Sequence, residues 1–305
     1  DLLTAGGYKL TLDYNHDSVD QAVLYKELGL NRESVMADGR GVYSHVPGDF
    51  MLTNTGEGGA KATSFSVQKS FDNGLSMFGS WASVSAEDVY PLTSAQAESA
   101  YGYTQRWDGE NMSANRSSFM VEHKFLATLD YTTQFIGDND TRFSLVFVRK
   151  AGEPYSVVFD EPGYNSVTGN SRFYADYSLA YIPTGASDPN VSFTSAAVAT
   201  AVMAHVNSTG LSGYKGSHVP KNAFNSPWYS RLDLRITQDI KVFGDTKLVV
   251  FLDMLNLLNM IDDESGIVRE YSYNNSRQII VDGVTSSGQF IISGVDPDDS
   301  LYIRN

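Results

Sequence analysis

The sequence predicts an all-β protein whose antiparallel strands form a transmembrane β-barrel, and three observations support this fold class. Apolar and polar side chains alternate from Ser226 to Asn259, so one face of each strand suits hydrocarbon and the other suits water. The strand-like segments run about 9 to 11 residues, the length that a tilted strand needs to cross a bilayer. Tight turns alternate with long polar loops, as they do on the two rims of an outer-membrane barrel.

The first strands are indicated by alternating segments that end in turn residues. Tyr8–Tyr14 alternates and ends in a polar run, and Thr63–Phe71 places its apolar side chains on one face. The triplet Asp72–Gly74 predicts a hairpin turn, because Asp, Asn and Gly tolerate the left-handed backbone that such turns require. We therefore expect Leu75–Trp81 to return antiparallel to Thr63–Phe71.

Three further strands are expected between residues 119 and 147. Phe119–Phe125 and Leu129–Phe135 each place apolar side chains on one face, and a tight connection is expected at Phe125–Ala127. The turn at Gly137–Asp140 then leads to Phe143–Phe147. These segments predict neighbouring antiparallel strands.

The clearest alternation lies in two strands on either side of a turn expected at Phe243–Thr246. The apolar face is formed by Leu232, Leu234, Ile236, Leu248, Val250, Leu252 and Met254. The polar face is formed by Arg231, Asp233, Arg235, Lys247 and Asp253. Val249 and Phe251 interrupt this polar face, and they would pack against a plug inside a barrel or in the core of a soluble sandwich. Periodicity alone leaves both architectures open.

Long connections are expected on one rim of the predicted barrel. Tyr90–Ser118 and Pro154–Asn225 are polar segments with scattered aromatic residues, and they contrast with the tight turns on the opposite rim. One short loop helix is expected from Ser195 to Gly210, which begins near a capping Ser and ends at a Gly. Its valines at 198, 202 and 206 predict a packing surface, with a partner groove as the lesser alternative.

Composition narrows the functional class. The formal net charge of -14 and the scattered basic residues argue against a nucleic-acid partner. The absence of Cys excludes disulfides and thiolate metal sites. Acidic runs such as Asp262–Glu264 are expected to be solvated loop tips, although a calcium site stays open as a weaker alternative.

Catalytic and cofactor motifs are missing from the chain. The five histidines lack metal-ligand spacing, and the sequence contains no nucleophile elbow, phosphate-binding loop or dinucleotide fingerprint. His123 lies on an apolar strand face, where packing at an interface is expected rather than catalysis. We expect no enzyme activity, no cofactor and no metal site.

Four stretches resemble a known family in their order and spacing. They are FSVQKSFDNGLSMFGSWASVSAEDVYPLTS (Phe65–Ser94), TRFSLVFVRKAGEPYSVVF (Thr141–Phe159), YSLAYIPTGASDPNVSF (Tyr177–Phe193) and GYKGSHVPKNAFNSPWYSRLDLRITQDI (Gly213–Ile240), the last followed by Asn256–Asn259. The chain thereby resembles the C-terminal part of the β-barrel of TonB-dependent outer-membrane receptors of the Oar-like group. Lys221 departs from the pattern, because an Arg is expected there.

The resemblance implies a plugged, 22-stranded barrel in the outer membrane of a Gram-negative bacterium. Residues 1–305 are expected to form one partial barrel domain, with the plug domain and N-terminal regions outside this chain. The implied function is energy-coupled transport of a bulky ligand or polypeptide. The implied partners are outer-membrane lipid, the plug domain, the remaining barrel strands and the TonB energy-coupling complex.

Site residues are assigned by combining this resemblance with the alternation. Candidate ligand contacts in the outer loops are Tyr155, Tyr164, Phe173, Tyr174 and Tyr181. Arg231, Asp233, Arg235 and Asp253 are expected to face the lumen, and Trp81, Trp228 and Tyr229 are expected in the membrane girdles. Two alternatives remain: a secreted soluble β-sandwich that binds through Tyr-rich loops, and a small self-contained outer-membrane barrel that acts as an enzyme.

Overall fold

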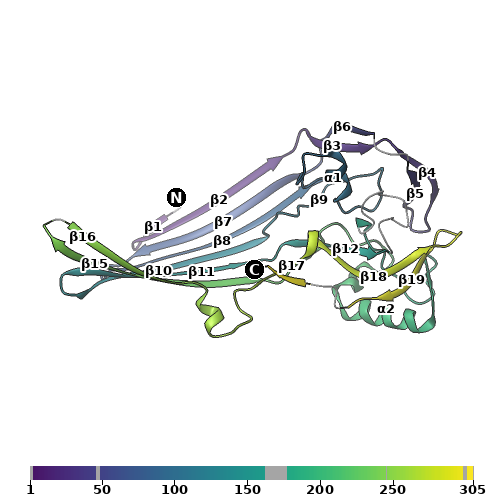
Figure 1. The fold of residues 1–305 in the computed structure, drawn as a ribbon. Coiled ribbons are helices and arrows are strands. Elements are labelled where there is room, and N and C mark those ends of the chain that lie inside the picture. The colour runs from purple at the N-terminus through teal and green to yellow at the C-terminus, as the bar shows by residue number, and fades with distance from the viewer. Residues whose placement is uncertain (1–2, 46–48, 162–176, 245, 298–300, 305) are drawn as a thin grey trace.

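A long antiparallel sheet carries a cap of small sheets and helices at one end (Figure 1). The computed structural model describes residues 3–45, 49–161, 177–244, 246–297 and 301–304. The long sheet has the order β1-β2-β7-β8-β10-β11-β15-β16, and β9 also pairs with β8. Its strands are β1 (Leu3–Ala5), β2 (Tyr8–Ser18), β7 (Gly59–Ser70), β8 (Leu75–Asp88), β9 (Asn115–Arg116), β10 (His123–Ile136), β11 (Asn139–Lys150), β15 (Tyr229–Phe243) and β16 (Thr246–Met254).

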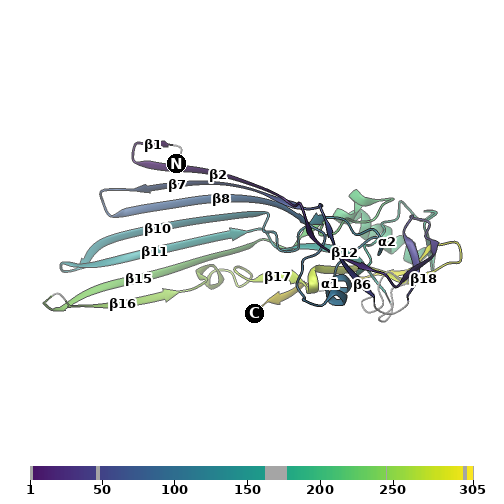
Figure 2. The ribbon, with the colours of Figure 1, turned by 90° about the horizontal axis from the view of Figure 1, so that it is seen from above.

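The sheet is open among the described residues. β1 and β16 lie at its opposite edges, and the strands between them run side by side (Figure 2). The all-β class and the antiparallel pairing of this sheet are confirmed. None of the helices in the described ranges is long and apolar enough to span a bilayer.

Two predicted turns are confirmed by the strand register. The first hairpin turn follows β7 and precedes β8, and Gly74 within it has φ +84. The second joins β15 to β16, where Leu234 faces Met254 and Ile236 faces Leu252. Each strand pair therefore keeps its apolar side chains on the same face.

The tight connection predicted at Phe125–Ala127 is wrong. β10 runs without a break from His123 to Ile136, and it pairs with β8 on one side and β11 on the other. The segment lacks Gly, Pro, Asn and Asp at the supposed turn, so nothing in it favours a reversal. Phe119 lies outside the strand, and the reversal occurs after Ile136.

The cap contains folded structure where long loops were predicted. Its main sheet has the order β13-β19-β18-β12-β14, with β12 parallel to β18 and β13 parallel to β19. These strands are β12 (Pro154–Asp160), β13 (Val191–Phe193), β14 (Phe224–Asn225), β18 (Asn275–Val284) and β19 (Phe290–Val295). The cap is therefore a mixed β-structure with its own core, which the sequence did not reveal.

Smaller elements complete the cap and its connection to the sheet. Three two-stranded sheets pair β3 (Ala22–Glu27) with β6 (Phe50–Thr55), β4 (Leu30–Val35) with β5 (Gly41–His45), and β17 (Val268–Tyr271) with β20 (Leu301–Arg304). The helical elements are α1 (Ala97–Gly102), α2 (Ala196–Ser208), η2 (Gly210–Tyr214), η3 (Leu257–Met260) and η4 (Ser272–Asn274).

The predicted loop helix is confirmed as α2. Ser195 caps it, because its hydroxyl accepts a hydrogen bond from the backbone amide of Val198 at 3.2 Å. Val202 and Val206 are fully buried in the core that α2 shares with the main cap sheet. The expected packing surface is therefore present.

Candidate functional site

One face of the long sheet is a continuous apolar surface. The register aligns Met77, Leu129, Leu145, Leu234 and Met254 across five neighbouring strands. A further aligned row contains Leu75, Tyr131, Phe143, Ile236 and Leu252. Leu12 is 53% exposed and Leu252 is 55% exposed, so no described element covers this face at either edge. An apolar surface of this extent is typical of contact with lipid or protein.

The opposite face carries charged pairs. Arg235 forms a bidentate salt bridge with Asp253, with Nε–Oδ1 and Nη2–Oδ2 distances of 2.6 Å and 2.7 Å. Arg231 Nε lies 2.8 Å from Asp233 Oδ1. The four residues predicted to face a lumen therefore share one face and pair with one another.

Apolar residues interrupt this polar face as the sequence predicted. Val249 and Phe251 are both exposed, and the Arg235 guanidinium lies 5.0 Å from the centre of the Phe251 ring. Val249 is paired with Asp239 of β15 in the register. The described residues thus leave these two side chains open to a further contact.

Aromatic rings gather where the apolar face meets the cap. Trp81 and Trp228 each stack with His123, with ring centres 6.0 Å and 6.3 Å away. The Arg149 guanidinium lies 5.3 Å from the Trp228 ring. Tyr229 lies at the same end, but its register position places it on the face of Arg231. Tyr229 therefore does not join Trp81 and Trp228 on the apolar face.

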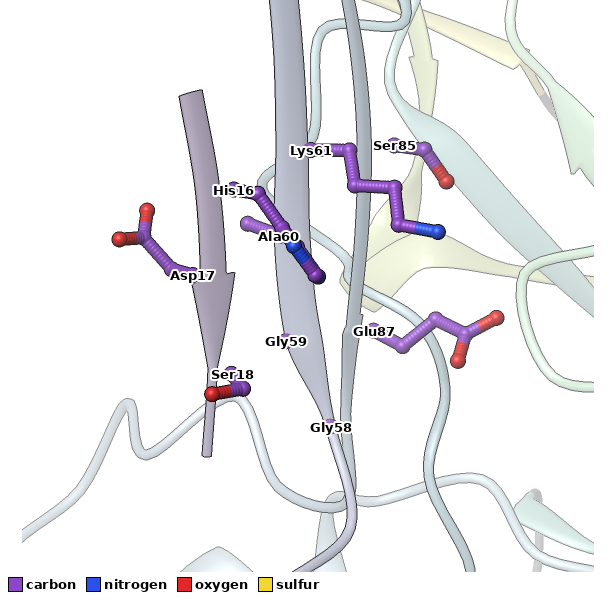
Figure 3. A pocket seen from close by; sticks show the side chains of 9 residues that line it. All are labelled: His16, Asp17, Ser18, Gly58, Gly59, Ala60, Lys61, Ser85 and Glu87. Atoms are coloured by element: carbon purple, nitrogen blue, oxygen red, sulfur yellow. The ribbon is translucent and has the colours of Figure 1, made fainter. Parts of the chain in front are cut away.

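Polar side chains replace the apolar ones beyond this aromatic group. His16, Lys61 and Ser85 are aligned across β2, β7 and β8, and they line a hollow of about 200 Å³ (Figure 3). In Figure 3 the side chains of Lys61, Ser85 and Glu87 extend to one side of the sheet, while that of Asp17 extends to the other. The apolar surface therefore has a sharp polar boundary at the cap end.

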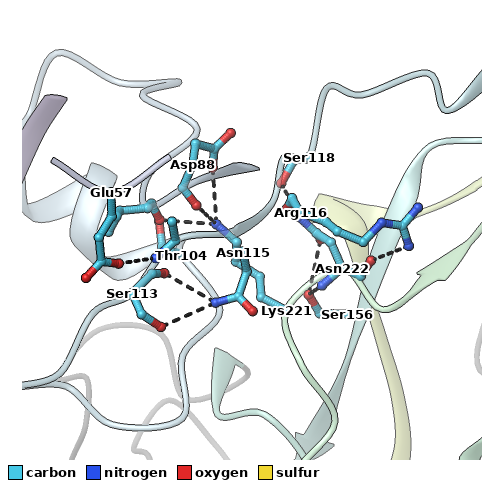
Figure 4. Close-up of polar contacts among 12 residues, drawn as sticks. Glu57, Asp88, Thr104, Ser113, Asn115, Arg116, Ser118, Ser156, Lys221 and Asn222 are labelled. Atoms are coloured by element: carbon cyan, nitrogen blue, oxygen red, sulfur yellow. Dashed lines mark hydrogen bonds and ion pairs between the residues drawn. The ribbon is translucent and has the colours of Figure 1, made fainter. Parts of the chain in front are cut away.

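A buried polar network anchors the cap to the sheet (Figure 4). Lys221 is 2% exposed, and its Nζ donates to the carbonyl oxygens of Asp88 and Val89 and to the Asp88 carboxylate. Burial lowers the pKa of Lys221, and the Asp88 charge opposes that shift. Asn222 lies beside it, and its side chain forms hydrogen bonds with Arg116, Ser118 and Ser156. Lys221, at the position where an Arg was expected, is therefore itself a buried cation.

Of the five predicted ligand-contact residues, the structure describes Tyr155 and Tyr181. Tyr181 is buried, and its hydroxyl donates to Asp188 at 3.1 Å, so its ring supports the cap from inside. Burial raises the pKa of the Tyr181 phenol. Tyr155 packs between Phe224 and Tyr271, with ring centres at 5.7 Å and 4.2 Å. Tyr164, Phe173 and Tyr174 lie outside the described residues.

A hollow of about 370 Å³ between α1 and η4 was not predicted from the sequence. Tyr103 and Tyr273 line it, with their ring centres 5.6 Å apart. The only signal for this site was a pair of Tyr-x-Tyr motifs, Tyr101–Tyr103 and Tyr271–Tyr273. Nothing in either motif showed that residues so distant in sequence would meet.

Among the described residues, no group of three or more His, Cys, Asp or Glu side chains has the geometry of a metal site. No family model, curated protein or solved structure matches the chain.

Proposed function

We propose that this chain is part of an outer-membrane β-barrel that transports a bulky ligand or polypeptide, as a TonB-dependent receptor does. The observation that carries the proposal is the long sheet, which has one continuous, exposed apolar face and one polar face with charged pairs. β7, β8, β10, β11 and β15 have 12 to 15 residues each, which is more than the roughly 9 to 11 that span a bilayer.

The dimensions of the apolar face support a membrane location. Lys61 and Lys69 stand on this face at the two ends of β7, eight positions apart. That separation is about 27 Å along the strand, or about 21 Å in height at a tilt near 40°. Outer-membrane barrels have an apolar band of about 25 Å, and long basic side chains reach the polar interface from its edges.

The soluble sandwich is supported less well. A sandwich buries the apolar face of one sheet against a second sheet about 10 Å away. The described cap instead lies at the end of the long sheet (Figure 1), and the apolar face stays exposed. The small barrel enzyme is also less favoured, because the described strands form an open sheet.

The polar face suggests how the barrel is completed. We place Arg231, Asp233, Arg235 and Asp253 toward the lumen, where Val249 and Phe251 would pack against a plug domain. β1 and β16 would pair with the remaining strands of a 22-stranded barrel, because unpaired strand edges are costly in lipid. The cap would lie on the outer side of the outer membrane of the Gram-negative cell. The TonB complex would supply energy from the inner side of that membrane.

Single-cysteine labelling tests the orientation of the sheet. The chain contains no Cys, so Leu234→Cys, Arg235→Cys and Ile236→Cys each introduce the single thiol of this chain. In native outer membranes, Arg235→Cys should react with a water-soluble maleimide, while its two neighbours should react poorly. After labelling with bimane in detergent and reconstitution into bilayers, nitroxide lipids should quench the bimane fluorescence more strongly at Leu234→Cys and Ile236→Cys than at Arg235→Cys.

The neighbouring positions serve as matched controls for one another. Equal aqueous labelling of all three thiols would contradict membrane insertion. The inverse pattern would place the apolar face in water and would contradict the proposed orientation of the sheet. A photo-reactive group at Phe251 provides a separate test, because a plug in the lumen should be captured by it.

A further inference from the structure

The missed hollow between α1 and η4 is built from three separate segments. The segment around α1 contributes Pro91, Thr93, Ser94, Ser99, Tyr103 and Gln105, the segment after β9 contributes Ser118 and Phe119, and η4 contributes Tyr273 and Asn274. Its volume of about 370 Å³ falls in the range of small-ligand sites. None of its lining residues belongs to a strand, so the hollow offers no strand edge for an extended peptide.

The chemistry of the lining is neutral and polar. None of the ten described residues that line the hollow is charged, although the chain as a whole has a net charge of -14. Hydroxyl and amide side chains dominate, including those of Thr93, Ser99, Gln105 and Asn274. Such groups both donate and accept hydrogen bonds, which suits a ligand rich in hydroxyls.

Aromatic rings provide flat apolar surfaces in the same hollow. The rings of Tyr103 and Tyr273 stack with an interplanar angle of 6°. Tyr177 meets the edge of Tyr103 with ring centres 5.9 Å apart and supports the stack. Tyr273 is 66% exposed and Phe119 is 63% exposed, so both present ring surface to solvent. Exposed aromatic rings beside polar groups are typical of recognition sites.

The backbone around the hollow is strained. Leu92, Tyr273 and Asn274 have φ values of +49, +51 and +57, and they are three of the five described non-glycine residues with positive φ. Hydrogen bonds hold this conformation, because Gln105 Nε2 donates to the Tyr273 carbonyl at 3.1 Å and Asn274 Nδ2 donates to the Pro154 carbonyl at 2.8 Å. Strain retained in this way clusters at binding sites.

We propose that this hollow binds a neutral oligosaccharide. The C–H face of a sugar ring would lie on Tyr273 or Phe119, while its hydroxyls would bond to the Ser, Thr, Gln and Asn side chains. An uncharged lining favours neutral sugars, because a carboxylate or phosphate brought into it would lose hydration without gaining a cation. The inference does not depend on membrane insertion or transport, since the hollow lies within the cap.

Binding is measured by calorimetry and saturation-transfer NMR on the full chain in detergent micelles. The neutral probes are maltohexaose, cellohexaose and mannohexaose, and hexagalacturonate is the anionic counterpart. We expect at least one neutral probe to bind and hexagalacturonate to bind more weakly than that probe. Failure of all three neutral probes, or preference for the anionic one, would overturn the proposal.

Two substitutions locate the bound sugar. Tyr273→Gly removes the exposed ring but suits the left-handed backbone, so the cap should remain folded while affinity falls about tenfold or more. Phe119→Ala should also weaken binding. Phe135→Ala is the matched control, because Phe135 is 77% exposed at the turn end of β10. Unchanged affinity in Tyr273→Gly, or an equal loss in Phe135→Ala, would refute the site.

Discussion

Asn222 should be one of the most sensitive positions in the cap. It is fully buried, and its Nδ2 donates to the Arg116 carbonyl at 2.6 Å and to Ser118 Oγ at 3.1 Å. Its Oδ1 accepts a hydrogen bond from Ser156 Oγ at 3.2 Å (Figure 4). The side chain therefore connects β12 to β9 and the segment that follows it, and its own backbone belongs to a third segment.

The cost of Asn222→Ala follows from these contacts. Three hydrogen bonds are lost, each with a net value of about 1 kcal/mol, and orphaned buried partners add about 1 to 3 kcal/mol. The residue has φ +57, where Ala is less favourable than Asn by roughly 1 kcal/mol. We expect the opening free energy of the cap to fall by about 5 to 7 kcal/mol. Asn222→Gly should cost about 1 kcal/mol less, because glycine accepts this conformation.

Hydrogen–deuterium exchange of the full chain in micelles measures this local opening. Peptides covering residues 115–118, 154–158 and 219–225 should lose protection together. Asn225→Ala is the matched control, because Asn225 is exposed and its bonds to Arg116 and Glu122 lie at the surface. Exchange of Asn222→Ala at the rate of the unmodified chain, or equal opening of the Gly and Ala variants, would contradict this expectation.

Three further predictions concern the turns, a buried phenol and a helix cap. Gly74→Ala should destabilise the protein by about 2 kcal/mol more than Gly137→Ala, because an added Cβ at Gly74 would meet a carbonyl of β10, whereas Gly137 faces open space. Urea unfolding of both variants in micelles measures this difference in stability. Equal losses of stability in the two variants would contradict the prediction. Burial raises the pKa of Tyr90, whose hydroxyl donates to the Tyr25 carbonyl, so its contribution to stability is present below about pH 10 and is lost as pH rises through the raised value. Tyr90→Phe should therefore lose less cap protection at alkaline pH than the unmodified chain, and identical pH profiles would exclude this role. Ser195→Ala should weaken α2 by about 1 kcal/mol, whereas Ser195→Asp should retain the cap, as amide exchange in the first turn will show.

The faces of the long strands could be predicted because alternation is a local property of an extended chain. Leu234 and Arg235 must point to opposite faces whatever their partners are, and the register pairs them with Met254 and Asp253 as the pattern required. The same reasoning failed at Phe125–Ala127, because alternation continues through β10 and cannot mark where a strand ends. A cluster of turn residues marks that point, and such a cluster, Gly137–Asp140, follows Ile136.

The cap could not be predicted from local patterns. Ser156 pairs with Asn275 in a parallel arrangement across more than a hundred intervening residues. Such a pairing depends on chain crossings and on a shared core, and neither leaves a periodic signal in the sequence. Tyr181 was therefore predicted as an exposed contact, although it is buried beside Asp188.

The amino-acid sequence alone specifies a β-protein with one hydrocarbon-compatible face, since side-chain alternation follows directly from strand geometry. It also determined the capped helix α2, because a helix start depends on a few adjacent residues. The contacts of Tyr103 with Tyr273 and of Asn222 with Ser156 depend instead on tertiary packing. These contacts join segments that are distant along the chain, and their positions are fixed by the packing of the whole cap rather than by any local preference of the backbone.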